Sequence, residues 1–123
     1  MPQLTGSAPH FLVGDLLPAL DYYVDVLGFA RPPLWGDPPV FAMPTRDAFI
    51  VMLNQVEGRA ARPQGDGIWD AYFWCDNADE LFAEFADAGA RIAHPPEDRP
   101  LYGNREFAIQ DLDGHLLAFG ADL

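Results

Sequence analysis

Cysteine, basic residues and long apolar runs are scarce in this chain of 123 residues. The single cysteine, Cys75, excludes a disulfide framework within the chain and a cysteine-rich zinc site. Seven basic against 19 acidic residues give a net charge of −12, which repels nucleic-acid phosphates. No apolar run approaches the roughly 20 residues that span a bilayer, and the N-terminus lacks the order of a signal peptide. We therefore expect a cytoplasmic protein that binds neither nucleic acid nor membranes.

Apolar residues, proline and glycine are plentiful instead. Half of the residues are hydrophobic, which suffices for the core of one domain of this length. The 12 Pro and 11 Gly divide the chain into short elements, and a proline-rich loop is expected after residue 93. Arg46 and Asp47 are predicted to turn the strands on either side into a hairpin. The pattern predicts helices within 15–28 and 77–89, and strands at 10–13, 29–34, 40–43, 48–53, 68–76, 91–93, 106–110 and 115–120.

Both predicted helices carry residues typical of helix ends. Asp15 is a candidate N-cap, and Asn77 followed by Glu80 resembles a capping box. Gly28 and Gly89 follow the last apolar residue of each helix, where a left-handed residue commonly ends a helix. These signals indicate where each helix begins and ends.

The order of elements occurs twice. The segment from Asp15 to Gly28 has the same length as the segment from Asp76 to Gly89. Two copies of strand–helix–strand–strand–strand therefore follow one another. We predict one domain, residues 1–123, made of two βαβββ repeats at about 8–56 and 68–121 that are joined by a linker at 57–67.

A βαβββ unit has a single helix, which covers only one face of its sheet. Two units side by side can form a curved mixed sheet with the helices outside and a cleft inside. The expected fold is therefore α+β, with a curved mixed sheet around a cleft. An ordinary ferredoxin-like α+β domain is the alternative, and the count of about eight strands fits it less well.

The stretch 70–76 alternates between two kinds of side chain. Successive strand residues point to opposite faces of a sheet. Phe73 is then expected to face a helix, whereas Asp70, Tyr72 and Trp74 face the cleft. This strand is the natural centre of a binding site.

Several short motifs, each weak by itself, resemble the vicinal oxygen chelate superfamily, which includes glyoxalase I, extradiol dioxygenases and bleomycin-resistance proteins. The resemblance covers nearly the whole chain and implies the glyoxalase/bleomycin-resistance fold. The motifs are Val13-Gly14-Asp15-Leu16, Tyr22-Tyr23, Leu27-Gly28-Phe29, Asp76-Asn77-Ala78-Asp79-Glu80-Leu81 and Asp111-Leu112-Asp113-Gly114-His115.

Metal-using members of the superfamily place one ligand on each of four strands. The resemblance puts these positions at Ala8, near Ile50, at Asp70 and at Ala118, so a single oxygen donor remains. A catalytic divalent ion needs about three protein donors. His10 could be a shifted ligand, but one His beside one Asp is more often a hydrogen-bonded pair. We therefore expect neither a metal nor a cofactor.

The closest resemblance is to the bleomycin-resistance proteins. The segment 102–108 resembles their Trp-Gly-Arg-Glu-Phe-Ala stretch, with Tyr102 in place of Trp and Asn104 as an extra residue. The resemblance implies a homodimer that binds a small molecule in clefts at the subunit interface. It also implies an N-terminal arm that is exchanged between subunits about a hinge at Pro9. The implied function is metal-independent sequestration of a flat aromatic or cationic antibiotic, and hence antibiotic resistance.

Rings and carboxylates are the side chains that would hold such a ligand. Stacked rings contribute about 0.5–1.5 kcal/mol per pair beyond area burial, and a carboxylate attracts a cation. The candidate ligand-binding residues are His10, Trp35, Phe41, Met52, Asp70, Tyr72, Trp74, Tyr102 and Arg105.

Other functions and roles stay open. Arg105 could instead form an ion pair with a carboxylate such as Glu106. His94 and His115 are expected to face solvent. The runner-up function is a glyoxalase-like lyase or dioxygenase-type enzyme with a degenerate or shifted metal site, in which His10 and Asp70 act as acid and base. A purely structural dimerising module is a third class.

Overall fold

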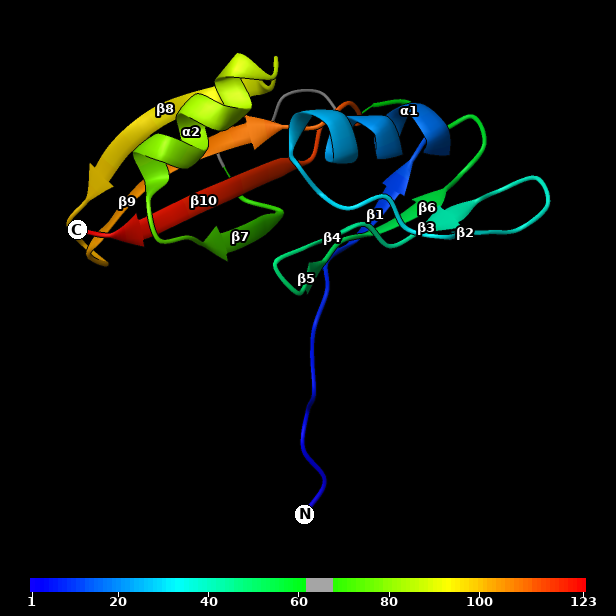
Figure 1. Cartoon of the computed structure of the whole chain (residues 1–123), viewed down its shortest axis with the longest axis horizontal. Coiled ribbons are helices and arrows are strands. Elements are labelled where there is room, and N and C mark those ends of the chain that lie inside the picture. Colours follow the sequence, from blue (N-terminus) through cyan, green and yellow to red (C-terminus); the bar gives the residue numbers. More distant parts are fainter. Residues whose placement is uncertain (62–67) are drawn as a thin grey trace.

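Two four-stranded sheets carry the helices of the chain on the same side, and the N-terminal arm leaves on the other side (Figure 1). The computed structural model describes residues 1–61 and 68–123, so most of the predicted linker lies outside the described residues. The first half consists of β1 (His10–Val13), α1 (Leu16–Asp21), the π-helical turn η1 (Tyr22–Val26), β2 (Leu34–Trp35), β3 (Phe41–Ala42), β4 (Thr45–Arg46), β5 (Phe49–Ile50) and β6 (Met52–Gln55). The second half consists of β7 (Ala71–Trp74), α2 (Ala78–Asp87), β8 (Arg91–Arg99), β9 (Asn104–Gln110) and β10 (Leu116–Asp122).

The two sheets have the same strand order. The first sheet runs β1-β6-β3-β2 and the second runs β7-β10-β9-β8, while β4 and β5 form a separate two-stranded hairpin. In each sheet the first strand of the half runs parallel to the last strand, and the other pairs are antiparallel. The prediction of an α+β chain with mixed sheets is confirmed, and β1 and β7 are each an edge of their own sheet.

The helix ends agree with the sequence except at the start of α1, and Gly28, which follows η1, has the predicted positive φ, +75°. The Asn77 side chain accepts a hydrogen bond from the Glu80 amide at 3.0 Å, and Gly89 has a φ of +93°. Asp15 makes no such bond. The amide of Leu16 donates instead to the Gln55 side chain at 2.8 Å, because β6 lies beside the helix start.

A hairpin turns one residue later than predicted, at Asp47 and Ala48, which have positive φ angles of 51° and 73°. It joins β4, which includes Arg46, to β5, whereas β3 pairs with β6. The prediction of a proline-rich loop after residue 93 is wrong. β8 continues through Pro95 and Pro96 to Arg99, with register shifts against β9 on either side of His94. Proline is tolerated there because β8 is an edge strand.

The core lies between the helices and the sheets. Phe85 of α2 packs against Phe107 of β9 and Phe119 of β10, with ring centroids 5.9 and 5.1 Å apart. In the first half, buried Leu16 and Leu20 belong to the same core cluster. Among the described residues no helix is long and apolar enough to cross a membrane.

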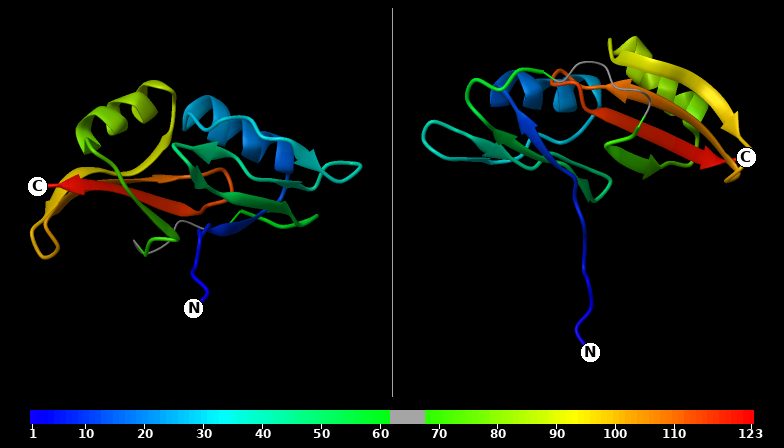
Figure 2. Two further views of the ribbon diagram at one scale, coloured as in Figure 1. Left: turned by 60° about the horizontal axis from the view of Figure 1, so that its bottom comes forward. Right: turned by 180° about the vertical axis from the view of Figure 1, so that it is seen from behind.

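The two halves are joined near the β9–β10 turn (Figure 2). The Tyr23 hydroxyl donates to Asp111 Oδ2 at 2.7 Å, and the Gly14 amide donates to Asp113 Oδ1 at 2.9 Å. Phe11 of β1 stacks on the His115 ring at 4.3 Å. The expectation that His115 faces solvent is wrong, because the ring fills this junction and is buried.

Candidate functional site

The sheet faces opposite the helices carry the exposed rings. Phe73 stacks on Phe119 beneath α2, at 5.3 Å between ring centroids. Its neighbours in β7, Tyr72 and Trp74, lie on the other face, with their rings 5.1 Å apart. Trp74 is 73% exposed, which is unusual for so large an apolar side chain.

A buried carboxylate lies behind these rings. Glu106 of β9 is fully buried. Its Oε1 accepts hydrogen bonds from the hydroxyls of Tyr72 at 3.1 Å and Tyr102 at 2.5 Å. Its Oε2 lies 3.4 Å from Nε of Arg99, and the Asn104 amide donates to the Tyr72 hydroxyl at 2.9 Å. The Tyr72 and Tyr102 rings are thus held by one carboxylate.

A cavity of about 510 Å³ opens over this group. Its walls combine aromatic rings with polar groups, which suits a flat ligand that carries a polar substituent. The lining residues are Trp69, Tyr72, Trp74, Tyr102, Asn104 and Asp122.

A second group of candidates lies on the first sheet. The rings of His10 and Phe41 are 6.4 Å apart, and those of Phe41 and Trp35 are 5.7 Å apart. Met52 lies opposite His10 in the register of β6 and β1. The structure therefore brings the candidates together in two groups, one on each sheet.

Asp70 and Arg105 have other surroundings. Asp70 Oδ2 accepts a hydrogen bond from the Leu116 amide at 2.8 Å, which ties the start of β7 to β10. Arg105 lies on the helix-bearing face and pairs with Asp79 and Asp98, both at 2.9 Å. Successive residues of β9 point to opposite faces, so Arg105 cannot reach its neighbour Glu106.

Sequence reasoning missed the polar centre of the group on the second sheet, which comprises Arg99, Asn104 and Glu106. One signal was available. Glu106 is the single acidic residue of β9 and directly precedes the apolar run Phe107-Ala108-Ile109, and an acidic residue in such a place indicates a buried polar interaction. His94, expected in solvent, is half-buried with its ring 5.4 Å from that of Trp69.

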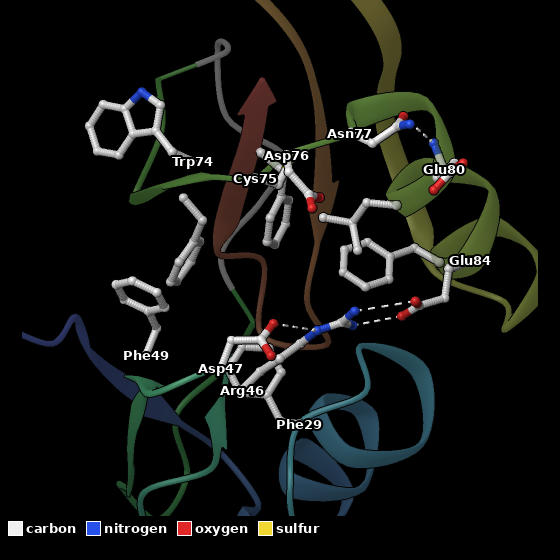
Figure 3. A pocket seen from close by; sticks show the side chains of 14 residues that line it. Phe29, Arg46, Asp47, Phe49, Trp74, Cys75, Asp76, Asn77, Glu80 and Glu84 are labelled. Atoms are coloured by element: carbon white, nitrogen blue, oxygen red, sulfur yellow. Dashed lines mark hydrogen bonds and ion pairs between the residues drawn. The ribbon is translucent and has the colours of Figure 1, made fainter. Parts of the chain in front are cut away.

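A further cavity of about 480 Å³ lies between the β4–β5 hairpin and α2 (Figure 3). Arg46 crosses it and bonds Glu84 at 2.6 and 3.2 Å. Phe49 and Trp74 lie at its other end. A third cavity of about 310 Å³, next to Pro9, also includes Trp74. Trp74 thus lines all three cavities, at the exposed edge of the second sheet.

The tyrosines of the chain retain their protons to unusually high pH. Burial raises the pKa of Tyr22 and Tyr72, and it raises the pKa of fully buried Tyr23 well above the usual value, aided by Asp111. Desolvation and the bond to Glu106 raise the pKa of Tyr102 to about 12. All four tyrosines are therefore neutral hydrogen-bond donors at physiological pH.

We expect the folded chain to show little tyrosinate absorbance near pH 10, where exposed tyrosines are about half ionised. Above that pH the unfolded chain loses protons that the folded chain keeps, so the free energy of unfolding falls as the pH rises. Below it this contribution is fully present. An absorbance titration with and without urea measures the difference. Tyrosine ionisation centred near pH 10 in the folded protein would contradict it.

The side chains that the structure describes do not fit a metal site. In the described part of the chain no three His, Cys, Asp or Glu side chains form a group that could hold one. The Asp70 carboxylate is engaged by a backbone amide, and positions 8 and 118 are alanines.

The family model described as the Glyoxalase/Bleomycin resistance protein/Dioxygenase superfamily matches residues 7–119. The chain belongs to this superfamily. The two halves with the same strand order are therefore those of a member of this superfamily.

Solved structures of the superfamily have the same fold. TioX from Micromonospora sp. ML1 is 29% identical, with a TM-score of 0.73 over 97% of this chain and 99% of that chain. The bleomycin-binding protein of Streptomyces verticillus, solved with copper(II)-bleomycin, is 24% identical, with a TM-score of 0.77 over all of both chains. The fosfomycin resistance protein FosX of Listeria monocytogenes is 15% identical, with a TM-score of 0.73 over 98% and 96% of the two chains. None of the curated proteins matches the sequence.

Proposed function

We propose that this superfamily member is a metal-independent binding protein that sequesters a flat, cationic small molecule, as in antibiotic resistance. The observation that carries the proposal is the cavity lined by Tyr72, Trp74 and Tyr102, in which both tyrosines bond the buried Glu106. Rings supply stacking, and a carboxylate behind them favours a cation. The similarity in fold to a bleomycin-binding protein supports the same class of ligand.

The proposed site is completed by a second copy of the chain. Trp35 on the first sheet and Trp74 on the second are 45% and 73% exposed, and both lie on faces that no helix covers. When the first sheet of one copy faces the second sheet of another, the two groups of rings enclose a ligand between them. A homodimer then contains two equivalent clefts.

The N-terminal arm suits such an assembly. Residues 1–7 are exposed and extend away from the sheets (Figure 1). Met1 and Leu4 have no cover within the chain, although both are apolar. We propose that the arm crosses to the partner subunit, with Pro9 at the point where it leaves β1.

A fluorescence titration tests the function. Because exposed tryptophans line the proposed cleft, copper(II)-bleomycin and ethidium are expected to quench tryptophan emission saturably. Trp74→Phe should reduce the quenching by ethidium, because Trp74 is the more exposed of the two tryptophans that line the cavity. Analytical ultracentrifugation with ethidium should give a dimer that holds one ligand per chain. Absence of any response to flat cations, with no retained ligand in native mass spectrometry, would refute the proposal.

A further inference from the structure

Two carboxylates are buried in the part of the chain that the structure describes, and they do different work. Asp111 joins the two halves. Glu106 lies on the opposite side of the second sheet, behind the exposed rings. Burying a carboxylate costs several kcal/mol unless its partners offset that cost, and an apolar residue of similar volume often fills such a place as well. A charged group here therefore calls for a role besides packing.

The first role is to orient two rings. Tyr72 comes from β7 and Tyr102 from the turn between β8 and β9, and their hydroxyls converge on the same oxygen, Oε1 of Glu106. Tyr102 is half exposed, and the preceding Leu101 is 94% exposed. The contact with Glu106 is thus what directs the Tyr102 ring toward the sheet. Asn104 fixes the Tyr72 hydroxyl from the other side.

The second role is to set the charge of the cavity. Arg99 is shared between Glu106 at 3.4 Å and Glu97 at 2.7 Å, so one guanidinium faces two carboxylates. Asp122 lines the same cavity, and none of its described lining residues is cationic. The local balance is therefore negative, and it acts most strongly where a ligand excludes water.

We infer that Glu106 is the positioning and specificity-determining residue of the cleft: it holds Tyr72 and Tyr102 as a preformed pair and makes the site select planar cations over planar anions. This inference rests on the proposed function and names its substrate class. A ligand of the expected class has a fused or linked aromatic body and a cationic substituent, such as an amine or amidinium. Glu106 acts through the tyrosines and through its charge.

The matched pair Glu106→Gln and Glu97→Gln tests the inference. Both variants remove one carboxylate charge beside Arg99, but only the first touches the tyrosines. With ethidium as the planar cation and anilinonaphthalene sulfonate as the planar anion, Glu106→Gln is expected to lower the ratio of cation to anion affinity about tenfold or more, as removal of a hydrogen-bonded charge would. Glu97→Gln should change that ratio less than about threefold, because its charge is exposed to solvent.

A spectroscopic readout separates this role from general stability. In Glu106→Gln the pKa of Tyr102 should fall back toward the usual value, which an absorbance titration detects. If Glu106→Gln does not fold, Tyr102→Phe carries the test: it frees the ring from Oε1 and should weaken ethidium binding about fivefold. Leu101→Ala, beside it in the same turn, should leave the affinity unchanged.

The outcomes are distinct. Wild-type protein that binds neither probe refutes the proposed function itself. If wild-type protein prefers ethidium, the binding function stands. The role of Glu106 is then refuted if Glu106→Gln leaves the ratio of cation to anion affinity unchanged, or if Glu97→Gln changes that ratio as much as Glu106→Gln does. Unchanged ethidium affinity in Tyr102→Phe refutes the positioning role in the same way.

Discussion

Replacing Asp111 with alanine is expected to lower the free energy of unfolding by about 3–5 kcal/mol, the range found when one partner of a buried charged network is removed. Asp111 is 1% exposed and accepts four hydrogen bonds. The donors are the Tyr23 hydroxyl at 2.7 Å, the His115 ring and amide, both at 2.8 Å, and the Asp113 amide at 3.0 Å.

The loss of unfolding free energy is large because the donors to Asp111 cannot form hydrogen bonds with water instead. The Tyr23 side chain is fully buried and the His115 ring is stacked against Phe11, so both would keep an unsatisfied polar group in the core. Tyr23 belongs to the first half and Asp111 to the second, so the substitution also removes a bond that joins them. Asp111→Asn should fall between wild type and alanine because its amide oxygen still accepts.

Urea unfolding followed by circular dichroism, at one protein concentration, measures the effect. Asp25→Ala is the control, since Asp25 is exposed on the helical segment that carries Tyr23. It should change the free energy of unfolding by no more than about 0.5 kcal/mol. Equal stability of the two alanine variants would show that the junction does not depend on Asp111.

The fold could be predicted from the sequence where local and global signals agree. Asn77, Glu80 and Gly89 specify the ends of α2 by hydrogen bonding and backbone conformation alone, so their roles do not depend on the rest of the chain. The extent of β8 could not be predicted in this way. Whether Pro95 and Pro96 are compatible with a strand depends on its place at the edge of the sheet, which is a tertiary property.

In the candidate site, too, local features could be predicted from the sequence and tertiary features could not. Alternation alone put Tyr72 and Trp74 on the face away from the helix, because neighbours in a strand cannot share a face. The cationic partner of Glu106 could not be predicted from its neighbours in the sequence. Arg105 is next to it in sequence but points to the other face, whereas Arg99 reaches it across the β8–β9 pair. Cross-strand register decides such pairs, and register requires the structure.

Gly120→Ala is expected to destabilise the chain by about 1–3 kcal/mol, the usual cost of overpacking, and to weaken ethidium binding about tenfold. Gly120 of β10 lies opposite Trp74 in register. A Cβ at this position would overlap the Tyr72 hydroxyl, lie 2.9 Å from its Cζ and lie 3.2 Å from Nδ2 of Asn104. The Tyr72 ring must therefore move, and it loses its bonds to Glu106 and Asn104.

The backbone contributes nothing to this effect, because Gly120 is not among the residues of positive φ. Adding Tyr72→Phe to Gly120→Ala removes the overlapping oxygen and should recover part of the lost stability, but not the binding, because the bond to Glu106 is still absent. Thermal unfolding and ethidium titration of wild type, Gly120→Ala and the double variant separate crowding from loss of the hydrogen bond. If Gly120→Ala binds ethidium as tightly as wild type, the orientation of Tyr72 does not matter to the cleft, and Glu106 would then act through its charge alone.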